Sequence, residues 1–148
     1  MAYIELQDLL DELGEDVLIQ LSDNTETGEI DEARVDKAVQ YARGVFDAYA
    51  RTRYSIPVPV TPMVQSINLD LAVFHLYKSR STVTKDSVYE VRKIANDDAI
   101  KLLTAINQGK AALDVPATEE TIESPMTGDA ILTNAARTKF TEDKLSGY

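Results

Sequence analysis

The sequence predicts an all-α fold, a small helical bundle with an extended C-terminal arm. Three observations lead to this prediction. Apolar residues recur at helical spacing in residues 31–54 and 85–107, which predicts two long helices with one buried face each. Residues 63–78 are apolar on nearly every side, which is typical of a central helix. The composition becomes polar after Lys110, so we divide the chain into a helical domain, residues 1–110, and an arm, residues 111–148.

The charge of the chain is concentrated at its N-terminal end. The net charge is −10, and residues 1–33 carry many Asp and Glu but no Lys or Arg. An acidic surface repels phosphate, which disfavours nonspecific nucleic-acid binding there. The chain has no cysteine and no apolar run near the ~20 residues of a membrane span, so we expect a soluble protein made in the cytoplasm, without membrane contact.

Residues 4–22 indicate two short helices. Leu6, Leu9, Leu10 and Leu13 have helical spacing, and Gly14 is suited to end the first helix. Residues 17–21 supply a second apolar face. Helices this short do not persist alone, so both must pack on a longer one.

The stretch from Asp23 to Arg34 is similar in spacing to a calcium loop of the EF-hand type. Asp23, Gly28 and Asp31 occupy suitable positions, but Arg34 stands where a bidentate Glu belongs, and a guanidinium cannot bind a cation. We therefore predict no metal ion here. Asp23 and Asp31 instead should cap local backbone groups.

The long helix of residues 31–54 should begin at Asp31 as N-cap and end before Pro57. Its length is roughly 35 Å, and its apolar stripe needs partners. The connector that follows, residues 55–62, is extended because of its prolines, with Ile56, Val58 and Val60 expected on the core surface. Thr61 and Pro62 should start the next helix.

The apolar helix of residues 63–78 has two polar exceptions. Asp70 should pair with a basic group, with Arg53 and Arg92 as candidates. A single His75 on an apolar face is more typical of a packing residue than of a base or a metal ligand.

The last helix, residues 85–107, should begin after Thr84 and end at Gly109. Its expected buried stripe consists of Val88, Val91, Ala95, Ala99, Leu102 and Ile106. Ile94, Ile100 and Leu103 widen the apolar face.

The arm has few large apolar residues and the composition of a segment that does not fold alone. We therefore expect it to dock on another chain, although it could also fold back on its own domain. Its expected contact residues are Arg137, Phe140, Leu145 and Tyr148, with Ile131 and Leu132 as further apolar anchors.

The sequence offers no catalytic constellation. There is one His, no Cys, no Gly-rich phosphate loop and no HExxH or GxSxG pattern, so we expect no enzyme, no catalytic residue and no cofactor. Arg and Tyr between residues 41 and 54 could form a nucleic-acid patch, but at helical spacing such side chains more often pack along a helix.

The order of these blocks resembles the Mu-type head-to-tail adaptor proteins of tailed phages. The resemblance covers residues 3 to about 110 and rests on the helix ending at Gly14, the loop from Leu21 to Asp31, the sequence YARTRY at 49–54, the proline connector and the apolar helix with Asp70. The ending from Arg137 to Tyr148 is similar to the tails of some members. Arg34 departs from members whose loop is closer to a calcium loop, so metal binding is not carried over.

The resemblance implies a structural subunit of the phage neck in the virion. The resemblance implies that such subunits form a homo-oligomeric ring of twelve copies beneath the portal. The ring links the portal to the next neck or tail protein, and each subunit reaches the portal with a C-terminal extension. DNA would pass through without specific binding, past a channel wall that includes the acidic residues Glu12, Glu15, Asp16, Glu26 and Glu29. The alternative interpretation is a small helical regulatory module whose acidic face docks a basic protein partner.

Overall fold

The computed structural model describes residues 2–80 and 87–115, which belong to one compact unit reaching Pro116. Its five helices are α1 (Leu6–Leu13), α2 (Glu15–Ser22), α3 (Glu32–Ala50), α4 (Pro62–Ser79) and α5 (Ser87–Asn107). The described ranges contain no strand. The predicted all-α bundle of two long, two short and one central helix is confirmed, while the arm beyond residue 115 lies outside the described residues.

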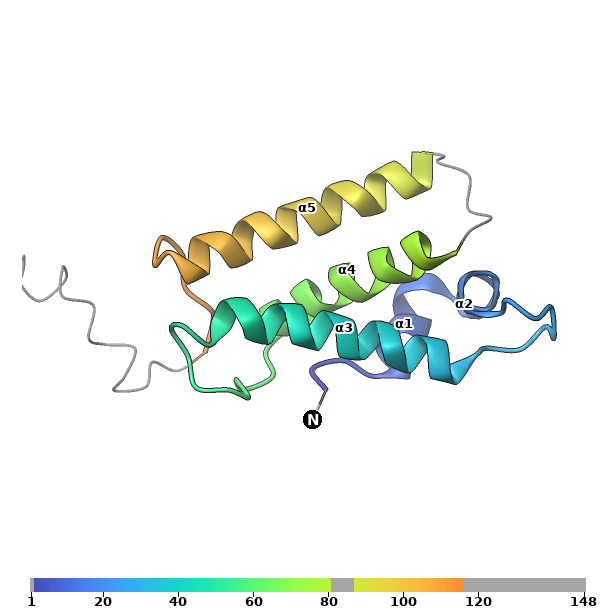
Figure 1. The fold of residues 1–148 in the computed structure, drawn as a ribbon, viewed down its shortest axis with the longest axis horizontal. Helices are drawn as coiled ribbons and strands as arrows, with labels where there is room; N and C mark the ends of the chain where they lie inside the picture. The colour runs from blue at the N-terminus through green and yellow to red at the C-terminus, as the bar shows by residue number, and fades with distance from the viewer. Residues whose placement is uncertain (1, 81–86, 116–148) are drawn as a thin grey trace, which may run out of the picture. The chain divides into compact units, whose positions relative to one another are not determined.

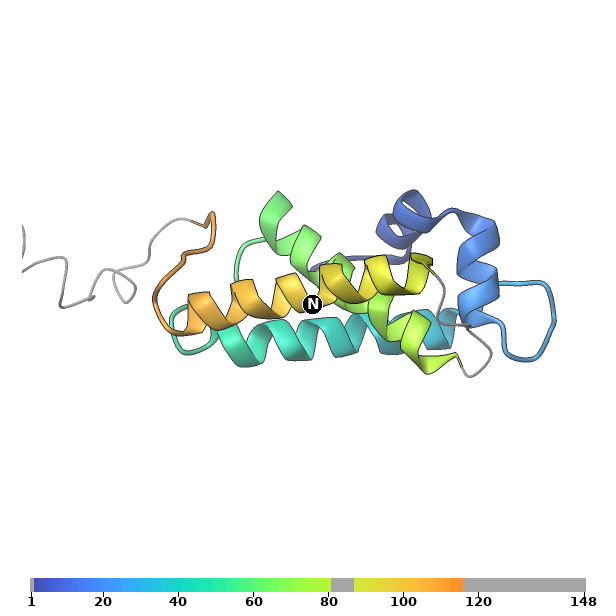
Figure 2. The same ribbon diagram turned by 90° about the horizontal axis from the view of Figure 1, so that it is seen from above.

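The bundle is built around α3 and α4 (Figure 1). Each of these two helices packs against the other and against all three remaining helices. α5 lies along α3 and α4, whereas α1 and α2 pack against the end of the bundle where α3 begins (Figure 2). Side chains buried on several faces of α4, including Val64, Ile67, Leu71 and Val73, confirm its central position.

α3 begins where the sequence predicts and ends earlier. The Asp31 carboxylate accepts a hydrogen bond from the Arg34 N–H at 3.2 Å, which confirms the predicted N-cap. The expected end at Tyr54 is wrong, because the helix stops at Ala50, whose carbonyl accepts from the N–H groups of Arg53 and Tyr54. The Asn107 side chain donates to the Tyr49 carbonyl at 3.2 Å, so the end of α5 satisfies a carbonyl that a longer α3 would bond internally.

The connector to α4 is only partly buried. Thr61 Oγ1 accepts from the Val64 N–H at 3.3 Å with Pro62 in the first turn, which confirms the predicted start of α4. Val58 is buried as expected, but Val60 is exposed. Strict alternation would put Val58 and Val60 on the same side, so the extended pattern that predicts burial of both does not hold to the end of the connector.

The packed unit continues past Lys110, where the sequence placed the start of the arm. Leu113 is buried, and its N–H donates to the Tyr54 hydroxyl at 2.9 Å. The Thr61 hydroxyl also bonds the Asp114 carboxylate. The chain therefore leaves the bundle beside the N-terminus of α4.

The predicted buried stripe of α5 holds only in the second half of the helix. Ala99, Leu103 and Ile106 are buried, whereas Val88, Val91 and Ile94 are 47%, 62% and 58% exposed. The expected burial of Val88 and Val91 is therefore wrong. The first half of α5 therefore presents more apolar surface than the neighbouring described residues cover. The predicted cap Thr84 lies outside the described residues.

A buried tyrosine fastens the N-terminal segment to the core. The Tyr3 hydroxyl donates to Asp47 Oδ1 at 2.6 Å and accepts from the Val58 N–H at 3.3 Å, and its ring packs edge-on against Phe46. Burial, with the hydrogen bond to Asp47, raises the pKa of Tyr3 to about 12.

Replacing this tyrosine tests the contact. Tyr3→Phe should lower the free energy of unfolding by about 1–3 kcal/mol, because the buried Asp47 and Val58 groups each lose a partner. The raised pKa also implies stability that is complete below pH 10 and declines as pH rises through about 12. Urea unfolding at pH 7 and at pH 11 checks both points. A variant as stable as the parent at pH 7 would contradict the role of the hydrogen bonds. A variant that loses as much stability as the parent between pH 7 and pH 11 would contradict the role of the Tyr3 pKa.

Candidate protein-docking surfaces

The acidic residues of the first 33 positions gather at the end of the bundle formed by α1, α2 and the loop before α3 (Figure 1). All five residues expected to line a channel, Glu12, Glu15, Asp16, Glu26 and Glu29, are exposed. Glu12 differs from the others because its carboxylate pairs with Arg92 of α5 at 2.7 Å. That contact joins α1 to α5, so Glu12 has a structural partner.

The loop between α2 and α3 is organised by Asp23. Its carboxylate accepts from the Gly28 N–H at 2.7 Å and from the Thr25 N–H at 3.2 Å, and the Thr25 and Thr27 hydroxyls also donate to it. These hydrogen bonds, that of Gly28 foremost, lower the pKa of Asp23. The predicted role of Asp23 as a local cap is thereby confirmed.

Arg34 is held inside the same loop. With its carboxamide oxygen facing the guanidinium, Asn24 accepts from both Arg34 Nη atoms, at 2.8 and 2.5 Å. The position of the last metal ligand in a calcium loop is therefore occupied by a cation, which donates charge-assisted hydrogen bonds to a carboxamide. Among residues 2–80 and 87–115, no three His, Asp or Glu side chains converge as metal ligands would.

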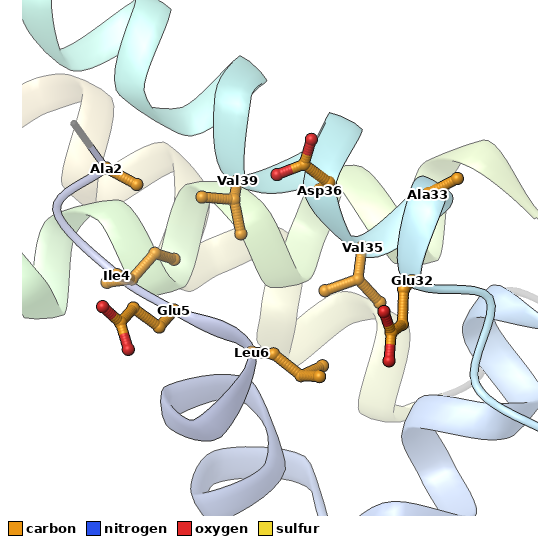
Figure 3. A pocket seen from close by; sticks show the side chains of 9 residues that line it. All are labelled: Ala2, Ile4, Glu5, Leu6, Glu32, Ala33, Val35, Asp36 and Val39. Carbon is orange, nitrogen blue, oxygen red and sulfur yellow. The ribbon is translucent and has the colours of Figure 1, made fainter.

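An apolar groove with an acidic rim lies between the N-terminal segment and the start of α3 (Figure 3). Its volume is about 490 Å³. Ile4, Val35 and Val39 lie at its base, and Ala2, Leu6 and Ala33 complete the apolar lining. The carboxylates of Glu5, Glu32 and Asp36 stand at its edge, and none of the ion pairs within the described part of the chain involves them. Such a surface fits an apolar side chain with basic neighbours.

Sequence reasoning missed this groove. Glu5 and Glu32 are far apart in the chain, and only the packing of the N-terminal segment on α3 brings them together. Neither segment carries a motif that identifies the site. The excess of Asp and Glu without Lys or Arg was the one available signal, and it does not single out these three residues.

The second surface is the exposed apolar row on the first half of α5, which we define as Val88, Val91 and Ile94. The sequence signal for it was present, since the apolar residues of this helix cover a wider face than one packing partner needs. A shallow pocket between α4 and α5 lies on the same helix, lined in part by Ala95, Leu102 and Asp70.

Asp70 does not form the predicted ion pair with Arg53 or Arg92. Arg92 pairs with Glu12 instead, and the Arg53 guanidinium lies against Gly109. Burial is the largest cause of the raised pKa of Asp70, and the Glu12 charge raises it further, whereas Arg92 lowers it. His75 stacks on Tyr41, with ring centres 4.2 Å apart, which confirms its predicted packing role.

The Asp70 environment predicts a stabilising substitution. A raised pKa means that the folded protein favours the protonated carboxyl, so stability falls as pH rises through the folded pKa. Asp70→Asn should therefore stabilise the fold at pH 7 by about 0.5 kcal/mol or less, since solvent screens this half-buried group. The gain should shrink below pH 4. Thermal unfolding at both pH values measures it, and a lower melting temperature at pH 7 would contradict the assignment.

Arg137, Phe140, Leu145 and Tyr148, the expected contact residues of the arm, lie outside the described residues. The described bundle therefore has two candidate docking surfaces, the groove and the α5 row, and the arm remains a sequence-based expectation.

Comparison with known proteins identifies the family. A family model described as Bacteriophage Mu, Gp36 matches residues 3–131. The Mu-like prophage FluMu protein gp36 of Haemophilus influenzae is 30% identical over 109 residues, which cover 73% of this chain and 72% of that protein. Within the described ranges, the helices are all too short or too polar to span a bilayer. The chain thus belongs to the Bacteriophage Mu Gp36 family and is a phage protein.

Proposed function

We propose that this protein is a structural head-to-tail adaptor of the phage neck, without catalytic activity. Copies of the chain form a closed, twelve-fold ring beneath the portal. The ring links the portal to the next neck or tail protein, and the arm after residue 115 provides the contact to the portal. Family membership supports a role in the phage particle.

The observation that carries the proposal is the exposed apolar row Val88, Val91 and Ile94. A contiguous row of three aliphatic side chains is uncommon on a surface that stays exposed to water. Burying each side chain at an interface contributes about 1.5–3 kcal/mol of stabilisation. A second copy of the chain is the partner that a ring requires. In a ring, each subunit offers one surface to the neighbour before it and a different surface to the neighbour after it.

The acidic end of the bundle supports a passive relation to DNA. Glu15, Asp16, Glu26 and Glu29 are exposed, and residues 1–33 contain no basic side chain that could bind phosphate. A channel wall with this charge repels the polyanion and lets it pass without adhesion. Mapping these residues to the outer rim of an assembled ring would remove this part of the proposal.

Native mass measurement tests the proposal. The full chain, alone and mixed with portal protein, should give a ring or a complex of matching symmetry. A strictly monomeric chain in both samples would contradict the adaptor role. That outcome would favour the alternative, a regulatory module that docks a basic partner, for which the acidic rim of Glu5, Glu32 and Asp36 provides a suitable surface.

A further inference from the structure

The groove bordered by Glu5, Glu32 and Asp36 has two requirements for an occupant. Its lining is apolar, with Ile4 and Val39 among its side chains, so it suits an aromatic or large aliphatic group (Figure 3). The three exposed carboxylates at its edge favour positive charge beside that group. A purely polar occupant would leave the lining exposed to water, and an acidic one would be repelled.

The α5 row of a neighbouring copy does not meet the second requirement. Ile94 has Glu90 one helical turn before it and Asp98 one turn after it, and both acids are exposed. In the groove, these acids would approach the carboxylates at its edge, which is unfavourable because like charges repel. The occupant of the groove is therefore a different surface.

A surface formed by α3 and α4 meets both requirements. We define it as the Tyr41 patch, which consists of Lys37, Tyr41, His75 and Lys78. Tyr41 is 45% exposed, and it is the one aromatic side chain among the large apolar residues exposed within residues 2–80 and 87–115. Its ring stacks on His75 of α4, which supports one face of the ring. The patch therefore presents a supported aromatic group to solvent.

Positive charge lies beside this ring. Lys37 is one helical turn before Tyr41 on α3, and Lys78 is nearly one turn after His75 on α4. Burial lowers the pKa of His75, and the Lys78 charge lowers it further, which places that ammonium close to the stacked pair. Both lysines are exposed, and neither belongs to an ion pair within the part of the chain that the structure describes. The patch therefore complements the acidic edge of the groove.

The groove and the Tyr41 patch lie on opposite sides of α3. Glu32 and Tyr41 are about two and a half helical turns apart, so their side chains point in opposite directions. The groove forms where the N-terminal segment covers α3, whereas Tyr41 contacts α4. Asp36 precedes Tyr41 by only about 8 Å along the helix axis. Two copies side by side can therefore bring the patch of one to the groove of the other at a similar height along α3.

We propose that the Tyr41 patch of one copy docks in the groove of the next copy. The Tyr41 ring lies on the apolar lining, and Lys37 and Lys78 face the carboxylates at its edge. Each copy uses its patch toward one neighbour and its groove toward the other, which is the head-to-tail type of contact that can close into a ring. The contact rests on the proposed ring, and it identifies two surfaces through which neighbouring copies meet.

Two charge-reversed variants of the full chain test this contact. The groove variant carries Glu32→Lys and Asp36→Lys, and the patch variant carries Lys37→Glu and Lys78→Glu. In either variant alone, every contact brings like charges together, so half-assembly should require a roughly hundredfold higher protein concentration than in the parent. Native mass measurement over a concentration series gives these values, under the conditions in which the parent forms rings. Circular dichroism checks that both variants fold.

Mixing the two variants in equal amounts should restore assembly. The reversed groove then meets the reversed patch, and the natural patch meets the natural groove, so rings of alternating copies form near the concentration that the parent requires. The mass of such a ring should show both variants in equal number. A mixture that assembles no better than either variant alone would overturn the pairing of groove and patch. If the groove variant does not fold, Asp36→Lys alone replaces it, with the same expectations.

Single substitutions provide the controls. Lys110→Glu reverses an exposed lysine outside both surfaces and should assemble like the parent. Tyr41→Phe should also assemble like the parent, because the apolar lining takes up the ring, whereas Tyr41→Ala should weaken assembly about tenfold. Loss of assembly in Lys110→Glu as well would show a nonspecific effect of charge and would count against the contact.

The outcomes separate this contact from the adaptor role. Assembly of the groove and patch variants at the concentration that the parent requires would overturn the contact and leave the adaptor proposal standing. A parent chain that stays monomeric, alone and with portal protein, would overturn the adaptor proposal and this contact with it.

Discussion

A chain that ends at Val115 is expected to fold normally and to fail in joining capsids to tails. The buried Leu113 and the bond between Thr61 and Asp114 lie before this position, so the truncation keeps every contact of the described bundle. The arm supplies the proposed contact to the portal. In infected cells that produce only the truncated chain, we expect filled or unfilled heads without attached tails in electron micrographs.

The position of the truncation separates a functional defect from a folding defect. A cut at Lys110 would remove Leu113, whose N–H bonds Tyr54 and whose side chain is buried, and should lower the melting temperature. The cut at Val115 should leave it unchanged. Full-length chains with Phe140→Ala or Tyr148→Ala test whether the expected contact residues carry the defect, with Thr127→Ala as a matched arm control. Normal particles from the Val115 truncation would contradict the role assigned to the arm.

Local chemistry in the sequence predicts most of the fold. Asp31 and Thr61 cap their helices as expected, and Gly14 adopts a positive φ of 81° between α1 and α2. The all-round apolar character of α4 correctly predicts its central position. These predictions succeed because caps, glycines and periodicity act over a few residues and depend little on distant partners.

The predictions that fail depend on contacts between distant segments. α3 ends at Ala50, and Asn107 of α5 and Leu113 bond the turn that follows, which no local pattern reveals. Arg92 pairs with Glu12, eighty positions away, although Asp70 was the expected partner. The groove likewise arises only when the N-terminal segment lies on α3. The α5 row failed for a different reason. The helical spacing of its apolar residues was correct, but it does not show whether another part of the same subunit covers them.

Charging the α5 row is expected to abolish ring assembly while preserving the fold. The double variant Val91→Lys with Ile94→Lys replaces two exposed side chains, so the free subunit should change in stability by no more than about 0.5 kcal/mol per site. At an interface the same change removes two buried aliphatic groups, together worth about 3 kcal/mol, and introduces two charges. A loss of about 3 kcal/mol corresponds to roughly a hundredfold weaker contact.

Asp97→Lys on the same helix serves as the control, because it introduces a lysine at an exposed position without removing apolar surface. Circular dichroism should show both variants as folded as the parent, and native mass measurement should show rings for the control alone. Rings formed by the row variant would mean that Val91 and Ile94 face another component of the neck. Loss of rings in both variants would point to a charge effect of α5 as a whole, since a ring held by the apolar row tolerates Asp97→Lys.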